Sequence, residues 1–335
     1  MARLDVLYIR AGGTGWGPVD ELAHLTARLL DGTLTTIDDR GEVSMLRKAA
    51  ASVPSPRRGD RVLLVLAASP AHLAYAARRE QWFPGYRTTV AWVIDSFWSD
   101  RISRFARRRG HFDHIAITDP DLLEEWSSAT GADVHLLPWG ADTLAAGAIP
   151  PDRPVDLVRI GRQPPAWDDD DRTIAMAREY GLVVEGRPSF HADVRENQSA
   201  VRHALKRAKF ALAFSNLVSP APYTHPTREY ITGRWTDSLA AGTTVAGVAP
   251  SAAATTLWPR ATVTLDPSDL RTGLEQLRRQ VDDWTPAIAA EQNRAARLRL
   301  DWRWRLKVIT SLLDVDESPA LRAELEQLGS SEENA

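Results

Sequence analysis

The fold and the chemistry of this chain are concentrated in one stretch, residues 225–245, which reads HPTREYITGRWTDSLAAGTTV. Small and apolar residues recur at helical spacing after the arginine, so we expect a helix over Arg234–Ala241 that stops at Gly242. A short, β-branched and apolar segment follows, and it predicts a buried strand over Thr243–Val248. Polar side chains ahead of such a helix–strand joint are typical of the edge where open α/β sheets bind ligands.

Two acids frame the start of this helix, with Glu229 on the preceding loop and Asp237 in the first turn. A carboxylate at that place is compatible with the helix dipole and can accept hydrogen bonds. Arg234 lies three residues before Asp237 on the same helix face, so it is either paired with that carboxylate or open to an anion. The alternative for the whole stretch is an ordinary surface loop that leads into a core strand.

The rest of the chain alternates buried strands with helical patterns, the sequence sign of parallel sheets covered by helices. At 335 residues and 44% apolar composition, the chain is long enough for two cores. We therefore predict an α/β protein with two Rossmann-like, doubly wound domains, 1–150 and 151–312, a proline-rich linker at 147–154 and a terminal segment, 313–335. The predicted strands are Asp5–Arg10, Arg61–Ala67, Thr88–Asp95, His114–Thr118 and Val134–Leu137 in the first half, and Val155–Ile160, Leu182–Glu185, Phe210–Ser215, Thr243–Val248 and Ala261–Leu265 in the second.

Composition excludes several classes of partner and site. A net charge of −3 from 41 basic and 44 acidic residues gives no bulk attraction for nucleic acid or anionic membranes, so any phosphate recognition is local. The absence of cysteine excludes disulfides, a thiol nucleophile and thiolate metal sites. The sequence begins without a signal-peptide hydrophobic region, and no apolar run approaches the length of a membrane span. We expect a cytoplasmic enzyme of bacterial type.

A glycine-rich loop, 11–18 (AGGTGWGP), follows the first predicted strand. Gly13 and Gly15 let the backbone turn tightly and approach a ligand, and the next helix start favours an anion. The loop lacks the Gly-Lys-Ser/Thr of a Walker A motif and the spacing of Gly-x-Gly-x-x-Gly. It is thus either a ligand-facing loop or a tight turn without a ligand.

Other side chains follow strands at the same predicted edge. Asp95 ends the third predicted strand and is the candidate base or ligand contact, while Trp98 is a candidate stacking platform; their alternatives are a helix cap and a core indole. His72 follows the second strand, although a single histidine is more often structural. Gly161-Arg162 follows the first strand of the second half, where a flexible turn bearing a guanidinium suits a diphosphate. Four consecutive acids, Asp168–Asp171, indicate a solvated helix start rather than a metal site.

The segment RWTDSLAAGT, 234–243, resembles the nucleotide-binding signature of the GT-B glycosyltransferases, in their group-1 and spore-maturation-protein-like branch. Glu229 and Asp237, separated by seven residues, resemble the paired acids of retaining members. Because the family usually carries Glu where this chain has Asp237, the reach to a ribose diol is one methylene shorter. LPWGAD at 137–142 is similar to the segment before the family's domain crossing, and DWRWR at 301–305 to its last helices, which cross back to the first domain.

This resemblance implies a metal-independent, hexosyltransferase-type enzyme that moves a sugar from a nucleotide-sugar donor to a small-molecule or glycan hydroxyl, across a cleft between the domains. It needs no cofactor, because the nucleotide sugar is a substrate. The candidate catalytic groups are Asp95, from its place at the sheet edge, and Glu229, from the resemblance. The implied donor-binding residues are Gly13, Gly15, Arg162, Tyr230, Ile231, Thr232, Arg234 and Asp237. The implied acceptor contacts are Trp16, Trp98 and His72.

The acid pair favours retention of configuration. An inverting enzyme needs a protein base opposite the leaving group, which Asp95, Asp20 or His24 could supply. Two other classes share these features: a non-hydrolysing nucleotide-sugar epimerase of the same architecture, and a catalytically silent nucleotide-sugar-binding protein.

Overall fold

The computed structural model describes residues 3–12, 14–38, 44–46, 59–76, 85–107 and 110–330. The chain divides into two compact units, of which unit 1 holds Met1–Pro138 and Arg303–Ser330 and unit 2 holds Trp139–Trp302. The chain therefore passes from one unit to the other after Pro138 and again after Trp302. Of the described helices, none is long and apolar enough to cross a membrane.

These boundaries differ from the predicted ones at 150/151 and 312/313. The segment that begins at Trp139 already packs in unit 2, because Ala141 joins the core cluster of Trp235 and Leu239. The backbone of Ala141 also pairs with Asp301 in an isolated parallel bridge. The proline-rich stretch at 147–154 is thus a turn inside unit 2.

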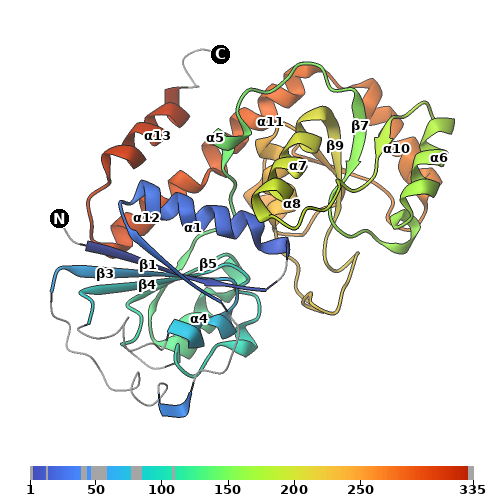
Figure 1. Cartoon of the computed structure of the whole chain (residues 1–335). Helices are drawn as coiled ribbons and strands as arrows, with labels where there is room; N and C mark the ends of the chain where they lie inside the picture. The colour runs from blue at the N-terminus through green and yellow to red at the C-terminus, as the bar shows by residue number, and fades with distance from the viewer. Residues whose placement is uncertain are drawn as a thin grey trace. The chain divides into compact units, whose positions relative to one another are not determined.

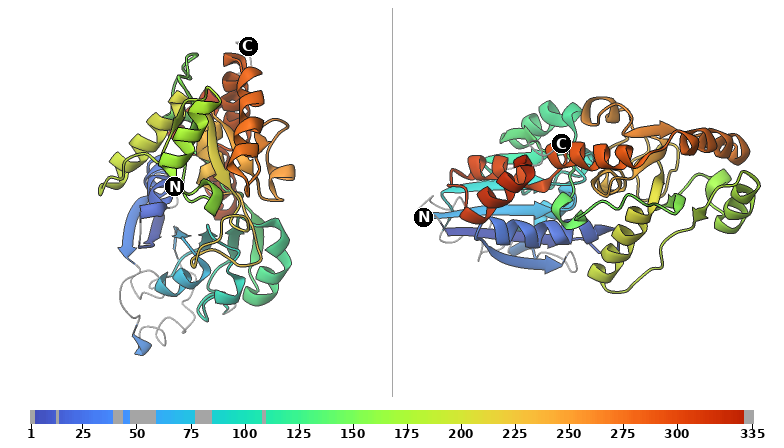
Figure 2. Two further views of the ribbon diagram at one scale, coloured as in Figure 1. Left: turned by 90° about the vertical axis from the view of Figure 1, so that its right-hand side faces the viewer. Right: turned by 90° about the horizontal axis from the view of Figure 1, so that it is seen from above.

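Unit 1 is built on a six-stranded parallel sheet in the order β2-β1-β3-β4-β5-β6 (Figure 1). The view from above in Figure 2 shows its strands side by side, with α1 over them. Strand β1 lies next to the edge strand β2, and all of it except its two end residues is buried in the core. The strands are β1 (Arg3–Arg10), β2 (Thr33–Asp38), β3 (Arg61–Ala67), β4 (Thr88–Val93), β5 (His114–Ile117) and β6 (Asp133–Leu136). The α-helices are α1 (Gly17–Leu29), α4 (Leu123–Thr130), α12 (Trp302–Leu313) and α13 (Pro319–Gly329), and the 3-10 helices are η1 (Thr14–Trp16), η2 (Pro70–Ala76), η3 (Ser99–Arg101) and η4 (Pro120–Leu122).

Every strand predicted from the sequence is present, and the predicted bounds of β3 match the structure. The sequence did not predict β2, because it is an edge strand of sequence TLTTID in which only Ile37 is buried. A polar edge strand lacks the apolar run by which buried strands are recognised.

The end of the chain returns to unit 1, as the fold class predicted. Helix α13 lies beside α1 (Figure 1), and Glu324 accepts hydrogen bonds from Arg28 Nη1 and from Arg303 Nε, each at 2.5 Å. Ser318 caps α13 and also donates to the carbonyl of Leu29. These contacts fasten the last two helices to the first one.

Unit 2 repeats the architecture with a five-stranded parallel sheet in the order β11-β10-β9-β7-β8. Alternate residues of β9 point to opposite faces: Phe210 and Phe214 pack with Trp167, and Ala211 packs with Leu205. Helices therefore cover both faces, which makes the unit doubly wound. The strands are β7 (Val155–Arg159), β8 (Val184–Glu185), β9 (Ala208–Phe214), β10 (Thr244–Val248) and β11 (Thr262–Thr264). The helices are α5 (Thr143–Ala146), η5 (Pro165–Trp167), α6 (Asp170–Glu179), α7 (Val194–Arg207), α8 (Gly233–Ala240), α9 (Ala253–Thr256), α10 (Leu270–Asp282) and α11 (Pro286–Arg299).

Each sheet reverses its strand order once, between β1 and β3 in unit 1 and between β7 and β9 in unit 2. At such a switch point the connections leave toward opposite faces, and the crevice at the carboxyl ends of the strands is where this kind of sheet binds ligands. In unit 2 that edge carries Gly161-Arg162 after β7 and Ser215-Asn216 after β9. In unit 1 it carries the glycine-rich loop after β1 and η2 after β3.

Candidate functional site

Helix α8 forms as the sequence predicts, one residue earlier than expected, at Gly233. Trp235 is fully buried and anchors the helix in the core. Gly242 ends it with a φ of +76°, and a Cβ there would lie 2.7 Å from the carbonyl oxygen of Ala289. Thr232 is the N-cap residue of α8, but its side chain accepts no hydrogen bond from the helix. The first N–H groups of α8 therefore lack a side-chain cap.

Two arginines lie close together at the switch point of unit 2. Arg162 Nε donates to the carbonyl of Ser219 at 2.5 Å, and its guanidinium lies 5.4 Å from the ring centre of Tyr223. Arg234 lies across Gly161, where a Cβ would come within 2.9 Å of its Cδ. Burial and the neighbouring Arg162 lower the pKa of Arg234 to about 10, so the Arg234 guanidinium is still charged at neutral pH. Two adjacent cations are stable together when an anion lies between them.

Arg234 has not taken the ion-pair alternative. Within the described part of the chain its Nη1 is buried without a hydrogen-bond partner, and no carboxylate stands among the charges that act on it. Buried polar atoms without partners cost free energy, so a group of them at one edge indicates a bound ligand or solvent. Four further buried atoms on the neighbouring loops also lack partners among the described residues, namely Thr232 Oγ1, Ser215 Oγ, Asn216 Oδ1 and Ser219 Oγ.

The two predicted acids are held by different elements. The Asp237 carboxylate lies over the first residue of α8, with Oδ2 3.1 Å from the position of a Cβ on Gly233, and the indole Nε1 of Trp139 is 3.5 Å from the same point. Glu229 accepts the N–H of Ser251 at 2.7 Å, in the turn after β10. Both carboxylates therefore belong to the carboxyl edge of the sheet.

The loop that carries Glu229 is anchored by Asn216, which follows β9. Asn216 Nδ2 donates to the carbonyls of His225, at 3.1 Å, and Arg228, at 2.5 Å. Ile231 packs against the buried core, which makes it an anchor of the segment. Tyr230 lies near enough to Arg234 to act on its charge. The structure thus brings the predicted donor residues of unit 2 to one edge.

Sequence reasoning missed four residues of this edge: Asn216, Ser219, Tyr223 and Arg187. Tyr223 and Ser219 contact Arg162, and Arg187 reaches the carbonyl of Gly161 at 3.0 Å. Asn, Ser and Tyr in a loop carry no sequence pattern of their own, so only the folded loop reveals these contacts.

In unit 1, Asp95 follows β4 at the functional edge. Its N–H donates to the carbonyl of Ala68 at 2.9 Å, which ties it to the end of β3. Burial raises the pKa of the Asp95 carboxyl to about 7, the range that suits a general base at neutral pH. His72 lies in η2 at the end of β3, and its Nδ1 accepts the N–H of Ser69 at 3.1 Å. The neutral imidazole therefore carries its proton on Nε2.

The remaining predicted ligand contacts of unit 1 are two tryptophans and two glycines. The guanidinium of Arg101 stacks on Trp98 at 3.4 Å from the ring centre, so one face of that indole is covered. Trp16 is half-buried at the start of α1. No atom of the described residues lies within 4 Å of a Cβ on Gly15, and Gly13 is not among those residues. Their roles at a ligand stay predictions.

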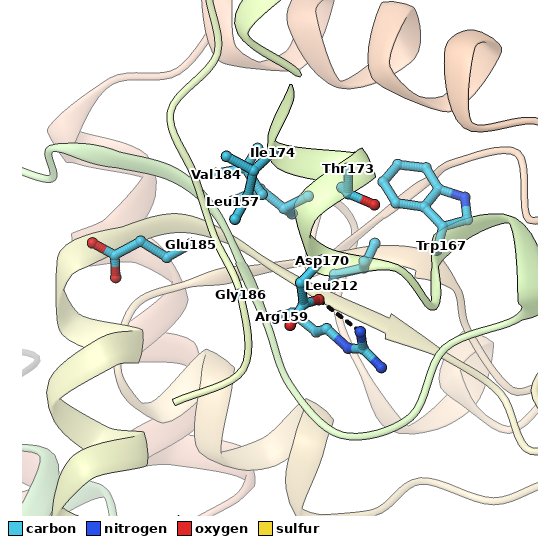
Figure 3. Close-up of a pocket in the computed structure, with 10 residues that line it drawn as sticks. All are labelled: Leu157, Arg159, Trp167, Asp170, Thr173, Ile174, Val184, Glu185, Gly186 and Leu212. Atoms are coloured by element: carbon cyan, nitrogen blue, oxygen red, sulfur yellow. Dashed lines mark hydrogen bonds and ion pairs between the residues drawn. The ribbon is translucent and has the colours of Figure 1, made fainter. Parts of the chain in front are cut away.

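The four consecutive acids start a helix, as predicted. Asp169 caps α6 by accepting the N–H of Arg172 at 2.9 Å, while Asp168 and Asp170 pair with Arg159. Asp170 and Arg159 line a small pocket beside Trp167 and Gly186, with room for about one water molecule (Figure 3). Among the described residues, no group of three or more His, Cys, Asp or Glu side chains is arranged to hold a metal ion.

Structural comparison with known proteins identifies the fold, whereas sequence comparison finds no match. No family model matches the chain, and no curated protein matches it. The crystal structure of Anabaena HepE in complex with UDP superposes with a TM-score of 0.59 at 11% identity, over 93% of this chain and 99% of that chain. The fold is GT-B. AviGT4, a glycosyltransferase involved in avilamycin A biosynthesis, has a TM-score of 0.51 at 14% identity over 99% of each chain. The lipopolysaccharide outer core galactosyltransferase WaaB has a TM-score of 0.52 at 13% identity, over 92% of this chain and 98% of that chain. These likenesses confirm the predicted GT-B architecture, and the spore-maturation-protein-like branch stays a prediction.

Proposed function

We propose that this chain is a glycosyltransferase that moves a sugar from a nucleotide-sugar donor to an acceptor hydroxyl. The observation that carries the proposal is the pair Arg162 and Arg234 at the switch point of unit 2. Arg234 has a buried, unpartnered Nη1 there among the described residues, and two guanidiniums lie together without a carboxylate acting on Arg234. A site of this kind suits a diphosphate, since arginine binds phosphate oxygens through two parallel N–H groups.

In this proposal the two arginines stabilise the charge that develops on the leaving diphosphate. That is the role a metal takes in other phosphate-leaving reactions, so we propose that transfer proceeds without one. Asp237 accepts hydrogen bonds from the ribose hydroxyls. Glu229 and the segment 230–232 lie along the sugar and the phosphates. HepE, which shares the fold, has been crystallised with UDP, and with UDP and glucose, which makes uridine nucleotides the first to test.

We further propose hexosyl transfer with retention, by analogy of the acids Glu229 and Asp237 with retaining enzymes. A retaining path lets the leaving phosphate accept the proton of the acceptor hydroxyl on the same face. Asp95, with a pKa of about 7, is the protein base for an inverting path. The anomeric configuration of the product, read by NMR during turnover, decides between the two. The acceptor contacts Trp16, Trp98 and His72 and a cytoplasmic location belong to the same proposal.

The proposal is tested first by binding. The purified protein is screened by thermal shift and calorimetry against UDP, GDP, ADP, dTDP and their common sugar conjugates. We expect one nucleotide to bind, Asp237→Ala to abolish its binding, and Arg162→Ala to weaken the binding of the diphosphate. If no nucleotide binds, or if both variants bind as the wild type does, the glycosyltransferase assignment is wrong. Conversion of the donor sugar without any acceptor would instead identify an epimerase.

A further inference from the structure

The turn Gly161-Arg162 is held by contacts that the donor proposal does not use. Gly161 has a φ of +72°, a conformation open to glycine and rarely to other residues. Its carbonyl oxygen accepts from Arg187 Nη2 at 3.0 Å and lies 3.4 Å from Arg159 Nε. Because the peptide is planar and trans, fixing that carbonyl also fixes the direction of the Arg162 N–H.

The two arginines that hold the carbonyl are linked through Asp170. Arg159 is buried at the end of β7 and donates from Nη1 to Asp170 Oδ1 at 2.6 Å, the contact drawn in Figure 3. The other oxygen, Oδ2, accepts the backbone N–H of Arg187 at 3.2 Å. A Cβ on Gly186 would lie 2.7 Å from that oxygen, so the chain passes the carboxylate without room for a side chain.

The Asp170 carboxyl of this network is held in its charged form. Burial acts to raise the pKa of Asp170, but the hydrogen bonds from Arg159 and from the Arg187 N–H outweigh it and lower that pKa. Asp168 also pairs with Arg159, so the charge of this buried guanidinium is compensated within the network. Arg162 has a carbonyl and an aromatic ring as its neighbours instead.

We propose that Arg159, Asp170 and Arg187 form a positioning network for Arg162, which sets the geometry of the diphosphate site without touching the nucleoside. The inference rests on the proposed function, because it assigns Arg162 to the donor phosphates. Arg187 comes from the loop after the edge strand β8, and it acts on Arg162 through the shared peptide. The network therefore affects the β-phosphate and leaves the recognition of base and ribose unchanged.

The test separates these two parts of the nucleotide. UDP, UMP and inorganic pyrophosphate serve as probes, with the matching diphosphate and monophosphate used if the screen selects another base. For Arg187→Ala we expect the Kd of the diphosphate to rise about tenfold, the loss of one hydrogen bond from a charged donor, and the Kd of the monophosphate to stay within about twofold. Asp170→Asn should show the same selectivity, and Arg187→Lys should recover part of the loss.

A matched control exists in the same unit. Arg278 lies 3.4 Å from the carbonyl of Gly181, another glycine with positive φ, at +67°, and Arg278→Ala should change neither Kd. A double-variant cycle tests the path of action. In an Arg162→Ala background Arg187→Ala should cause no further loss, whereas additive losses would mean that Arg187 contacts the phosphate directly and would overturn the proposal.

Equal weakening of monophosphate and diphosphate by Arg187→Ala would show a merely structural role and overturn the inference. No change in either Kd would do the same. In both cases the proposed function stands if the wild type binds a nucleotide and Asp237→Ala abolishes it. If the wild type binds none, the proposed function itself is wrong.

Discussion

Replacing Arg234 with methionine should stabilise the ligand-free protein and abolish its response to nucleotide. Burial and the neighbouring Arg162 lower the pKa of Arg234 to about 10. A base with a lowered folded-state pKa destabilises the fold wherever it is charged, here at every pH below about 10, and that cost disappears as the pH rises through the folded pKa. The shift corresponds to about 3 kcal/mol at neutral pH.

Methionine has a similar unbranched shape and carries no charge, so most of this cost is removed. The lost cation–π contact with Trp235, at 4.8 Å, offsets about 1 kcal/mol. We therefore expect Arg234→Met to raise the free energy of unfolding of the ligand-free protein by about 2 kcal/mol. Urea unfolding with and without a saturating nucleoside diphosphate measures both effects, since the wild type should gain stability from the ligand and the variant should not.

Arg153 provides the control. Burial lowers its pKa to about 10 as well, but its guanidinium donates to the carbonyls of Leu205, Ala208 and Ala241 and to Thr243 Oγ1. Arg153→Met would remove all of these hydrogen bonds from the buried interior, so it should destabilise the protein by about 3 kcal/mol or more. If Arg234→Met also destabilised the ligand-free protein by more than about 1 kcal/mol, Arg234 would stabilise the fold itself, and the argument for an anion site would fail.

Three further predictions concern other parts of the chain. Burial raises the pKa of the Asp95 carboxyl from 3.8 to about 7, so the free energy of unfolding should fall as the pH rises from about 4 to about 7, and Asp95→Asn should flatten that decline in urea unfolding. If the product has inverted configuration, Asp95→Asn should also remove a step near pH 7 from the transferase rate. An unchanged decline of stability in the variant would contradict the raised pKa. Glu324→Ala removes the acceptor of two arginines, so it should lower the free energy of unfolding by about 1 to 3 kcal/mol and speed hydrogen exchange in α13. Because hydrogen bonds from these arginines lower the pKa of Glu324, the wild type should lose its extra stability over the variant as the pH falls below about 4.5. Gly242→Ala places a Cβ 2.7 Å from the carbonyl oxygen of Ala289 at a φ of +76°, so it should destabilise unit 2 by about 2 kcal/mol or more. The control is Gly15→Ala, where no atom of the described residues lies within 4 Å of the new Cβ, and it should change the free energy of unfolding by less than about 0.5 kcal/mol.

The helices and strands, and their order along the chain, follow from local sequence patterns. Strands such as β3 and β10 and the helix α8 are recognisable because burial on a sheet or a helix imposes a period on a short, contiguous segment. The stop at Gly242 was predictable for the same local reason, since a residue of positive φ ends a helix there. The GT-B prediction came from the likeness of 234–243 to a nucleotide-binding signature, which can be recognised in sequence because the segment is contiguous.

Contacts between side chains from distant segments emerge only once the chain is folded. The edge strand β2 and the first crossing after Pro138 escaped prediction because burial in the assembled sheet, rather than local pattern, places them. Spacing left open whether Arg234 pairs with Asp237, and in the folded unit Arg234 lies across Gly161, which follows another strand. Arg187 reaches Gly161 across 26 residues of sequence because β8 pairs with β7 in the sheet. Contacts between residues distant in sequence depend on the order of the strands in the sheet. That order is set by the packing of the whole unit, so no single segment of the sequence reveals it.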